Sequence, residues 1–266
     1  VSNTFDWTWD GTAPTMTITS TAGTADGGSS NVAAFALTLT SNEATTNFVV
    51  GDITATGGDG CTLGSFNGAS ATAYTATCTP DNSGETVNVL VAAGAYTDAA
   101  GNNNAVSNTF DWTWDGTGPT MTITSATVAS GATTATAAIV FVYTSNEDTT
   151  DFALADITAT GCNNAGWGAT NAKIYGSTCT VSADTAASVL VAVDKFTDST
   201  GNNNQVSNTY SWTQDDTGPT MTITSGTVAS GSSTNTGAVV LIYTSNEVTN
   251  NFATGDITVT ECVHSD

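Results

Sequence analysis

The stretch VSNTFDWTWDGTGPTMTITS, residues 106–125, spans the end of one repeat unit and the start of the next. Nearly the same residues begin at Val1, as VSNTFDWTWDGTAPTMTITS, and at Val206, as VSNTYSWTQDDTGPTMTITS. Self-similarity at a fixed spacing is the sequence signature of a repeat architecture. The copies recur about every 100 residues, which is too long for a short solenoid repeat, so each unit is expected to have its own core.

Smaller blocks recur in the same order and set the frame of the units. TSNEATTNF, TSNEDTTDF and TSNEVTNNF begin at residues 40, 144 and 244, and TDAAGNNN and TDSTGNNN begin at residues 97 and 197. We expect the chain to be part of a longer array. The predicted units are residues 1–11 (last strand of a preceding unit), 12–115 (first complete unit), 116–216 (second complete unit) and 217–266 (first half of a third).

Alternation of apolar and polar residues, as at Phe35, Leu37 and Leu39, predicts strands, and no segment shows a sustained helical period. Thr and aromatic residues favour strands, while Gly, Pro, Asn and Asp bound them. The first complete unit contains seven predicted strands, at residues 15–20, 34–40, 48–56, 63–66, 73–79, 86–92 and 106–114. Seven strands in about 100 residues are typical of an immunoglobulin-like fold. The predicted fold is therefore all-β, with tandem immunoglobulin-like Greek-key β-sandwich domains in a linear array.

Charge and residue types exclude several classes of protein. The chain has 24 acidic side chains and two basic ones, Lys173 and Lys195, for a net charge of −22. Nucleic-acid binding is excluded because it needs Lys and Arg to neutralise phosphates, and no apolar run approaches the roughly 18 residues of a membrane span. The single histidine, His264, allows no Ser/His/Asp or Cys/His set, so we expect no enzymatic activity.

The five cysteines follow the repeat. Cys61 and Cys78 have the same spacing as Cys162 and Cys179, and Cys262 takes the first of these places in the third unit. The partner of Cys262 would lie past the end of the chain. Because no CxxC pair offers a metal site, we predict the disulfides Cys61–Cys78 and Cys162–Cys179. Disulfides indicate an oxidising compartment, and we expect an extracellular or cell-surface location.

Acidic and amide residues recur where three parts of each unit are expected to meet. In a sandwich of seven alternating strands, the second-to-third loop, the sixth-to-seventh loop and the start of the first strand lie at one pole. Carboxylate and amide oxygens at such a pole are ligands that Ca²⁺ prefers. We therefore predict Ca²⁺ at the boundaries between units. The candidate ligands are Asp10, Glu43, Asp98, Asn102, Asn104, Asp115, Glu147, Asp198, Asn202, Asn204, Asp215 and Glu247.

An alternative interpretation of these residues remains open. Asp and Asn are ordinary turn residues, and the repeated Asp-x-x-Gly-Asn block can form Asx-turns without an ion. The spacing matches neither an EF-hand loop nor a Ca²⁺-binding nonapeptide repeat.

Three tryptophan-bearing positions also invite interpretation. Gln214 replaces the tryptophan found at Trp9 and Trp114, which predicts an exposed or junction position, and Trp167 has no evident counterpart in the first unit, which favours a contact role.

Taken together, the blocks TGPTMTITS, TSNE…F…DITATG and TDxxGN resemble the bacterial Ig-like repeats of large biofilm-associated and other surface adhesins. The resemblance covers the whole chain. It implies tandem, secreted units that are often stiffened by calcium, and it points to Glu43, Asp98 and Asn102 with their repeats. The paired cysteines are a departure from most bacterial repeats.

Three functions remain open on this evidence. The units form the stalk of an adhesin, with self-association through further copies of the chain or its repeats, and with a glycan or another surface ligand bound elsewhere. Alternatively they are filament subunits, in which residues 1–11 of one chain supply the missing last strand of the half-unit of another. A third alternative is a carbohydrate-binding accessory module of a larger secreted protein.

Overall fold

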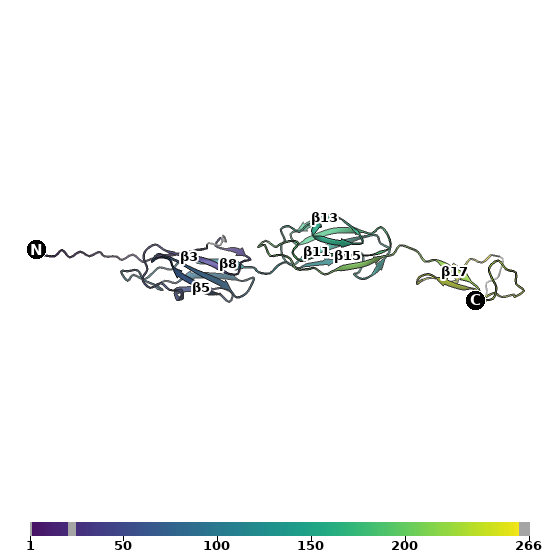
Figure 1. Cartoon of the computed structure of the whole chain (residues 1–266), viewed down its shortest axis with the longest axis horizontal. Helices are drawn as coiled ribbons and strands as arrows, with labels where there is room; N and C mark the ends of the chain where they lie inside the picture. The colour runs from purple at the N-terminus through teal and green to yellow at the C-terminus, as the bar shows by residue number, and fades with distance from the viewer. Residues whose placement is uncertain (1, 21–24, 261–266) are drawn as a thin grey trace.

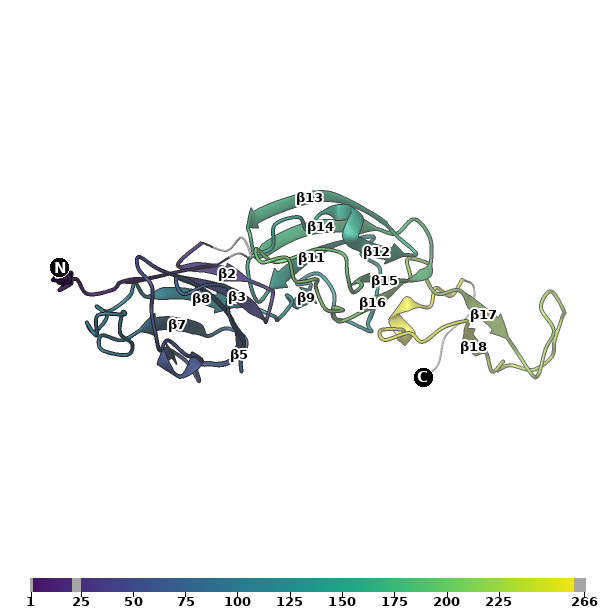
Figure 2. The same ribbon diagram turned by 60° about the vertical axis from the view of Figure 1, so that its left-hand side comes forward.

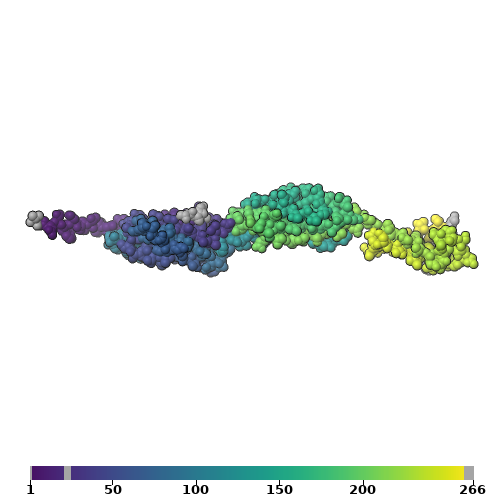
Figure 3. Space-filling view, in the orientation of Figure 1, coloured from purple at the N-terminus to yellow at the C-terminus, as the bar shows by residue number. Residues whose placement is uncertain are grey.

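The computed structural model describes residues 2–20 and 25–260, which form two complete β-sandwiches and part of a third unit (Figure 1). The sandwiches follow one another along the long axis of the molecule (Figure 3). In the first, the elements are β1 (Met16–Ser20), β2 (Gly28–Ser30), β3 (Phe35–Ser41), the 3₁₀ turn η1 (Val50–Asp52), β4 (Ile53–Thr56), β5 (Cys61–Gly68), β6 (Ala73–Pro80), β7 (Thr86–Val91) and β8 (Phe110–Trp114).

The second sandwich repeats this order, and the third unit contains its beginning. The second consists of β9 (Met121–Thr124), β10 (Thr133–Thr134), β11 (Ala138–Ser145), η2 (Leu154–Asp156), β12 (Ile157–Thr160), β13 (Asn163–Asn171), β14 (Ile174–Thr180), β15 (Thr185–Val191) and β16 (Tyr210–Gln214). The third unit has β17 (Met221–Thr224), β18 (Ile242–Ser245) and η3 (Thr254–Asp256).

Each sandwich packs two four-stranded sheets face to face (Figure 2). The sheets of the first have the orders β1-β3-β6-β5 and β2-β8-β7-β4, and those of the second have the orders β9-β11-β14-β13 and β10-β16-β15-β12. All pairs are antiparallel except β2 with β8 and β10 with β16. The predicted all-β, immunoglobulin-like sandwich fold is confirmed.

Aromatic side chains at alternate strand positions fill the space between the sheets. In the first sandwich, Trp112 is fully buried and stacks on Phe35 with ring centroids 4.6 Å apart. In the second, the ring centroids of Trp212 and Phe141, from the equivalent strands, are 5.4 Å apart. The alternation occurs because successive residues of a strand point to opposite faces, so every second residue enters the core.

Two predicted strands are shorter in the structure than the sequence pattern suggested. The third predicted strand begins at Ile53, because Asp52 accepts the backbone N–H of Val49 and closes the preceding 3₁₀ turn. The last begins at Phe110, because the side chain of Asn108 both accepts the N–H and donates to the carbonyl of Ile18. The short strands β2 and β10 were not predicted, since their Gly, Ser and Thr residues show no apolar alternation.

The two interpretations of the tryptophans have different outcomes. The position shared by Trp9, Trp114 and Gln214 varies, because Trp9 is 79% exposed, Trp114 is half-buried and Gln214 is 2% exposed. Trp114 and Gln214 are the last residues of β8 and β16, where one unit leads into the next. The prediction that Trp167 lacks a counterpart is wrong. Trp167 does have a counterpart: it stacks on Tyr175 at 5.4 Å, as Phe66 stacks on Tyr74 at 5.9 Å in the first sandwich. The sequence does contain the signal for this equivalence, since Phe66 follows Cys61 and Trp167 follows Cys162 at the same spacing, and both lie in the β-bulge of their strand.

The outer parts of the chain differ from the two sandwiches. Residues 2–15 form no strand, and Phe5 and Trp7 are 86% and 74% exposed. The assignment of residues 1–11 to a preceding unit and of 217–266 to half of a third therefore stays a prediction. Within the described ranges, the structure contains no helix with the length and apolar character needed to cross a membrane.

Candidate cation site at the start of each sandwich

Two groups of three carboxylates form at the predicted pole, one in each complete sandwich. We call them the first acidic cluster (Asp10, Glu43, Asp98) and the second acidic cluster (Asp115, Glu147, Asp198). In each cluster, one oxygen of every carboxylate lies within 4.8 Å of the others. The three segments that we predicted to meet therefore do meet, in both complete units.

Hydrogen bonds between the three segments hold the first acidic cluster together. The turn after β3 is tied to the segment before β1, because Asn42 accepts the N–H of Thr15 at 2.6 Å through its side chain and donates its own N–H to Thr15. The same turn pairs with the β7–β8 loop through an isolated bridge between Thr45 and Asp98. Asn146, Thr120, Thr149 and Asp198 repeat these contacts in the second sandwich.

The aspartate in the β7–β8 loop is buried and held by its own loop. Asp98 is 4% exposed, and its Oδ1 accepts the N–H groups of Ala100 and Asn102 at 2.9 and 2.8 Å. Burial alone would raise the pKa of Asp98, but hydrogen bonds from Asn102, Gly101 and Ala100 outweigh it and hold the pKa below its ordinary value. Asp98 therefore stays ionised at the base of the cluster.

The glutamate of each cluster is less well compensated than the aspartate. Glu43 Oε1 is buried and lacks a hydrogen-bond partner in the described structure, and a buried carboxylate oxygen without a partner is unfavourable. Burial raises the pKa of Glu147, and the negative charges of Asp115 and Asp198 raise it further. A hydrogen bond from Asn146 and the charge of Lys173 lower this pKa, but by less than the other causes raise it. Each cluster thus places a glutamate in an unfavourable anionic setting beside two further carboxylates, and this arrangement fits a hard divalent cation.

The amides of the repeated Gly-Asn-Asn-Asn block have other roles. Asn102 donates its NH₂ group to Asp98 Oδ2 and to the carbonyl of Asp10, so it joins the loop to the preceding segment. Asn202 makes the matching contacts with Asp198 and Asp115. In this orientation both residues act as donors rather than as cation ligands.

The prediction that Asn104 and Asn204 are ligands is wrong. Asn104 is 3% exposed, its Oδ1 accepts the N–H of Tyr96, and its NH₂ group donates to the carbonyls of Ala92 and Ala105. Asn204 makes the equivalent bonds in the second sandwich. Their polar atoms are used within the long loop before the last strand, which explains why the residue recurs.

The third predicted group does not assemble among residues 217–260. Asp215 is half-buried and its N–H donates to the carbonyl of Thr134, while Glu247 donates its N–H to Ser245. Both belong to no group of three carboxylates in the described chain. The aspartate of the long loop, Asp98 or Asp198 in the complete units, has no counterpart in these residues, so this pair stays a prediction.

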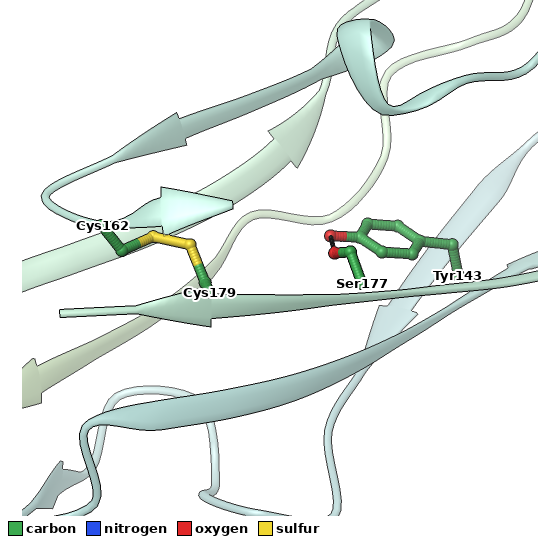
Figure 4. Close-up of a disulfide and its surroundings, with 4 residues drawn as sticks. All are labelled: Tyr143, Cys162, Ser177 and Cys179. Atoms are coloured by element: carbon green, nitrogen blue, oxygen red, sulfur yellow. Dashed lines mark hydrogen bonds between the residues drawn. A yellow bond between two sulfur atoms is a disulfide. The ribbon is translucent and has the colours of Figure 1, made fainter. Parts of the chain in front are cut away.

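Both predicted disulfides are confirmed, Cys61–Cys78 and Cys162–Cys179, with Cα atoms 5.5 and 5.6 Å apart. Cys78 and Cys179 point into the core and are fully buried. Figure 4 shows the second bridge beside the buried hydrogen bond between Tyr143 and Ser177, whose oxygens are 3.0 Å apart. Cys262 lies outside the described residues.

The fold and its repeated acidic loops define a tandem array of immunoglobulin-like sandwiches. Residues 10–113 match the family described as bacterial Ig-like domain. This match, over most of the first complete unit, confirms the resemblance to bacterial Ig-like repeats inferred from the repeated motifs. No curated protein sequence matched the chain.

Several solved structures are similar to the chain. The adhesin FdeC of Escherichia coli is 10% identical, with a TM-score of 0.39, and the match covers 82% of this chain and 68% of that one. InvD of Yersinia pseudotuberculosis is 14% identical, with a TM-score of 0.36 and coverage of 85% and 66%. The adhesin InvE of the same species is 13% identical, with a TM-score of 0.28 and coverage of 76% and 58%.

Proposed function

We propose that the chain is a structural spacer of a secreted, cell-surface adhesin, in which Ca²⁺ at the acidic clusters stiffens the links between Ig-like units. The observation that carries this proposal is the origin of the three carboxylates. Asp10 and Asp115 lie in the segments that lead into a sandwich, whereas the other two carboxylates of each cluster belong to that sandwich. An ion held by all three would fix the angle at which one unit follows the last.

The chemistry of the cluster favours calcium among common cations. Three carboxylates within a few ångströms repel one another, and Ca²⁺ both neutralises them and accepts a flexible shell of oxygen ligands. The contact between Asp115 and the second sandwich already exists, since Thr200 donates its hydroxyl to Asp115 Oδ2 at 3.2 Å. The residues that would hold the ion are Asp10, Glu43 and Asp98, and Asp115, Glu147 and Asp198.

Substituting Glu147 with glutamine is expected to have opposite effects with and without calcium. At neutral pH in EGTA, Glu147→Gln raises the melting temperature of the second sandwich, because the raised pKa of Glu147 means that its charged form destabilises the fold. In saturating Ca²⁺ the same variant melts below the wild type, because one of three anionic ligands is lost. Calorimetry of the full chain in both buffers measures the two shifts.

The control for this experiment is Asp194→Asn, which removes an exposed charge of the second sandwich that belongs to neither acidic cluster. This variant should respond to calcium like the wild type. A wild-type melting curve that is the same in EGTA and in Ca²⁺ would contradict the calcium proposal, and the acidic residues would then be turn-forming residues only.

Lys173 is expected to weaken calcium binding at the second acidic cluster. Lys173 donates to the carbonyl of Asn146 at 3.3 Å, and its charge lowers the pKa of the neighbouring Glu147, while Thr72 occupies the corresponding place in the first sandwich. One charge at about 4 Å in water contributes roughly 1 kcal/mol, or about fivefold in affinity. Lys173→Thr should strengthen binding at the second cluster by about this factor in a calorimetric titration, while Lys195→Ala changes nothing.

Neither alternative function gains support from the described sandwiches. Strand complementation by residues 1–11 gains no support from the described part of this segment, because residues 2–15 form no strand. Carbohydrate binding relies on exposed aromatic rings, and none of the exposed large apolar residues within β1–β8 or β9–β16 is aromatic. The spacer role remains the function that the geometry supports best.

A further inference from the structure

The outer face of one sheet in the second sandwich is uncharged and carries exposed valine and isoleucine side chains among threonines. None of the residues in β9, β11, β13 and β14 carries a charge, a property that these strands share with all described strands except β8, which contains Asp111. Val140, Val142 and Ile174 point outward from this sheet and are 52%, 39% and 36% exposed. Figure 2 shows these four strands side by side at one surface of the molecule. Solvent-facing sheets of soluble domains ordinarily carry charged residues.

One row of this face combines a ridge and a hollow. Across β11, β14 and β13 the register aligns Val142 with Gly176, and Gly176 with Gly168. The two glycines form part of the lining of a surface hollow of about 350 Å³, together with Val140 and Val142. Val142 therefore lies directly beside this hollow, because the two glycines of the row have no side chain to fill it.

The first sandwich has a flush, polar row at the same place. There the register aligns Thr38 with Thr75, and Thr75 with Asn67. Each of these positions carries a polar side chain in place of the valine and the two glycines. The two units have the same fold, and the ridge and hollow thus come from residue changes that the fold itself does not require.

The glycines are not explained by the unit in which they lie. Neither Gly168 nor Gly176 has a positive φ. A Cβ atom would meet nothing within 4 Å at Gly168, and at Gly176 it would make an ordinary contact of 3.5 Å with the carbonyl of Phe141. Glycine weakens a strand interior and often marks a place where another backbone or a ligand approaches closely. These two glycines point to contact from outside the sandwich.

We propose that this face is a self-association surface, on which a second copy of the chain packs sheet to sheet. A two-fold axis parallel to the strands and midway between β11 and β14 would place Val142 of each copy over Gly176 of the other. Val142 of each copy would then fill the hollow of the other copy, so the same contact forms twice, as an isologous interface requires. Gly168 widens the hollow for the opposing valine.

Shape and charge together favour a second copy over other occupants. Two chains of net charge −22 repel one another, and the strands of this face add no carboxylate to that repulsion, as is true of all described strands except β8. The valine beside the glycine-lined hollow distinguishes this face from the other uncharged ones. A charged partner would find no complementary charge on these strands, and a glycan would find no exposed aromatic ring. Because the chain is a tandem array, further units with the same face would add to the strength of a lateral contact.

Sedimentation of the full chain tests this proposal, in EGTA and in about 0.5 M salt, where charges are screened beyond about 4 Å. All variants carry Cys262→Ala, so that no disulfide joins two chains. We expect dimers whose fraction rises with concentration. Installing the row of the first sandwich, with Val142→Thr, Gly176→Thr and Gly168→Asn, should weaken association at least tenfold. These side chains already occur at the equivalent positions, and an unchanged second melting transition verifies folding.

The matched control is Val193→Thr with Val206→Thr, which removes two exposed valines elsewhere on the second unit (53% and 59% exposed) and should leave association unchanged. A chain that stays monomeric up to about 0.5 mM, weaker than most specific contacts, would overturn the proposal. So would equal losses in the control, or association that appears only with Ca²⁺. Retention of a monomeric chain on a glycan array would assign the face to a carbohydrate instead.

Discussion

Replacing Trp212 with alanine is expected to unfold the second sandwich at temperatures where the first stays folded. Trp212 is 2% exposed and packs with Phe141 and Tyr210 between the two sheets. Removing a buried Trp side chain costs about 3–5 kcal/mol, from lost burial and from the cavity left behind. A domain of this size is typically stable by about 5–15 kcal/mol, so the loss is a large part of the total.

Calorimetry measures this effect because each sandwich has its own core. The two clusters of buried residues share no member, so the chain should show separable transitions. Trp212→Ala should lower one of them and Trp112→Ala the other. Trp9→Ala, at a side chain that is 79% exposed, is the control and should shift neither. A loss of both transitions in either core variant would show instead that the units unfold as one body.

Removing the bridge Cys162–Cys179 by a double alanine substitution is expected to destabilise the second sandwich by roughly 3 kcal/mol. The two cysteines are 17 residues apart, and closing a loop of this size restricts the unfolded chain. Cys179 is also fully buried, so its loss removes apolar contacts in the core. The measurement is the free energy of unfolding from a urea titration of the full chain.

Reduction separates the contributions of the two bridges. Adding dithiothreitol to the double variant should lower the transition of the first sandwich, which retains Cys61–Cys78, and leave that of the second unchanged. In the wild type, reduction should lower both. A double variant as stable as the wild type would mean that the bridge does not constrain the unfolded chain, and that Cys162 and Cys179 are conventional core residues.

Several features of the chain were predictable because they depend on local periodicity. Strand positions such as Phe35–Ser41 follow from alternation, since a strand with one buried face must alternate. The pairing of Cys61 with Cys78 follows from a spacing that recurs once per unit. The proximity of Asp10, Glu43 and Asp98 follows from the alternating direction of the seven strands, because this order fixes which loops lie at the same end of the sandwich.

Other features depend on hydrogen-bond partners that are remote in sequence. Asn102 and Asn104 are two residues apart and look alike in the sequence, yet one joins the loop to Asp10 and the other is buried and accepts the backbone N–H of Tyr96. Which amide does which depends on the path of the loop in three dimensions. The packing of Trp167 also depends on the tertiary structure: its spacing from Cys162 matches that of Phe66 from Cys61, but only the structure shows that each ring stacks on a tyrosine of the neighbouring strand.

The amino-acid sequence by itself determined the repeat, the all-β sandwich class, the disulfide pairs and the pole where carboxylates gather. These features depend on strand alternation and unit spacing, which are properties of the order of residues along the chain. Only the tertiary structure decided which of those polar residues are free to hold a cation and which are used within a loop. It also placed Val142 beside Gly176 and Gly168, since neighbours across a sheet are set by strand register, which no single segment of sequence contains.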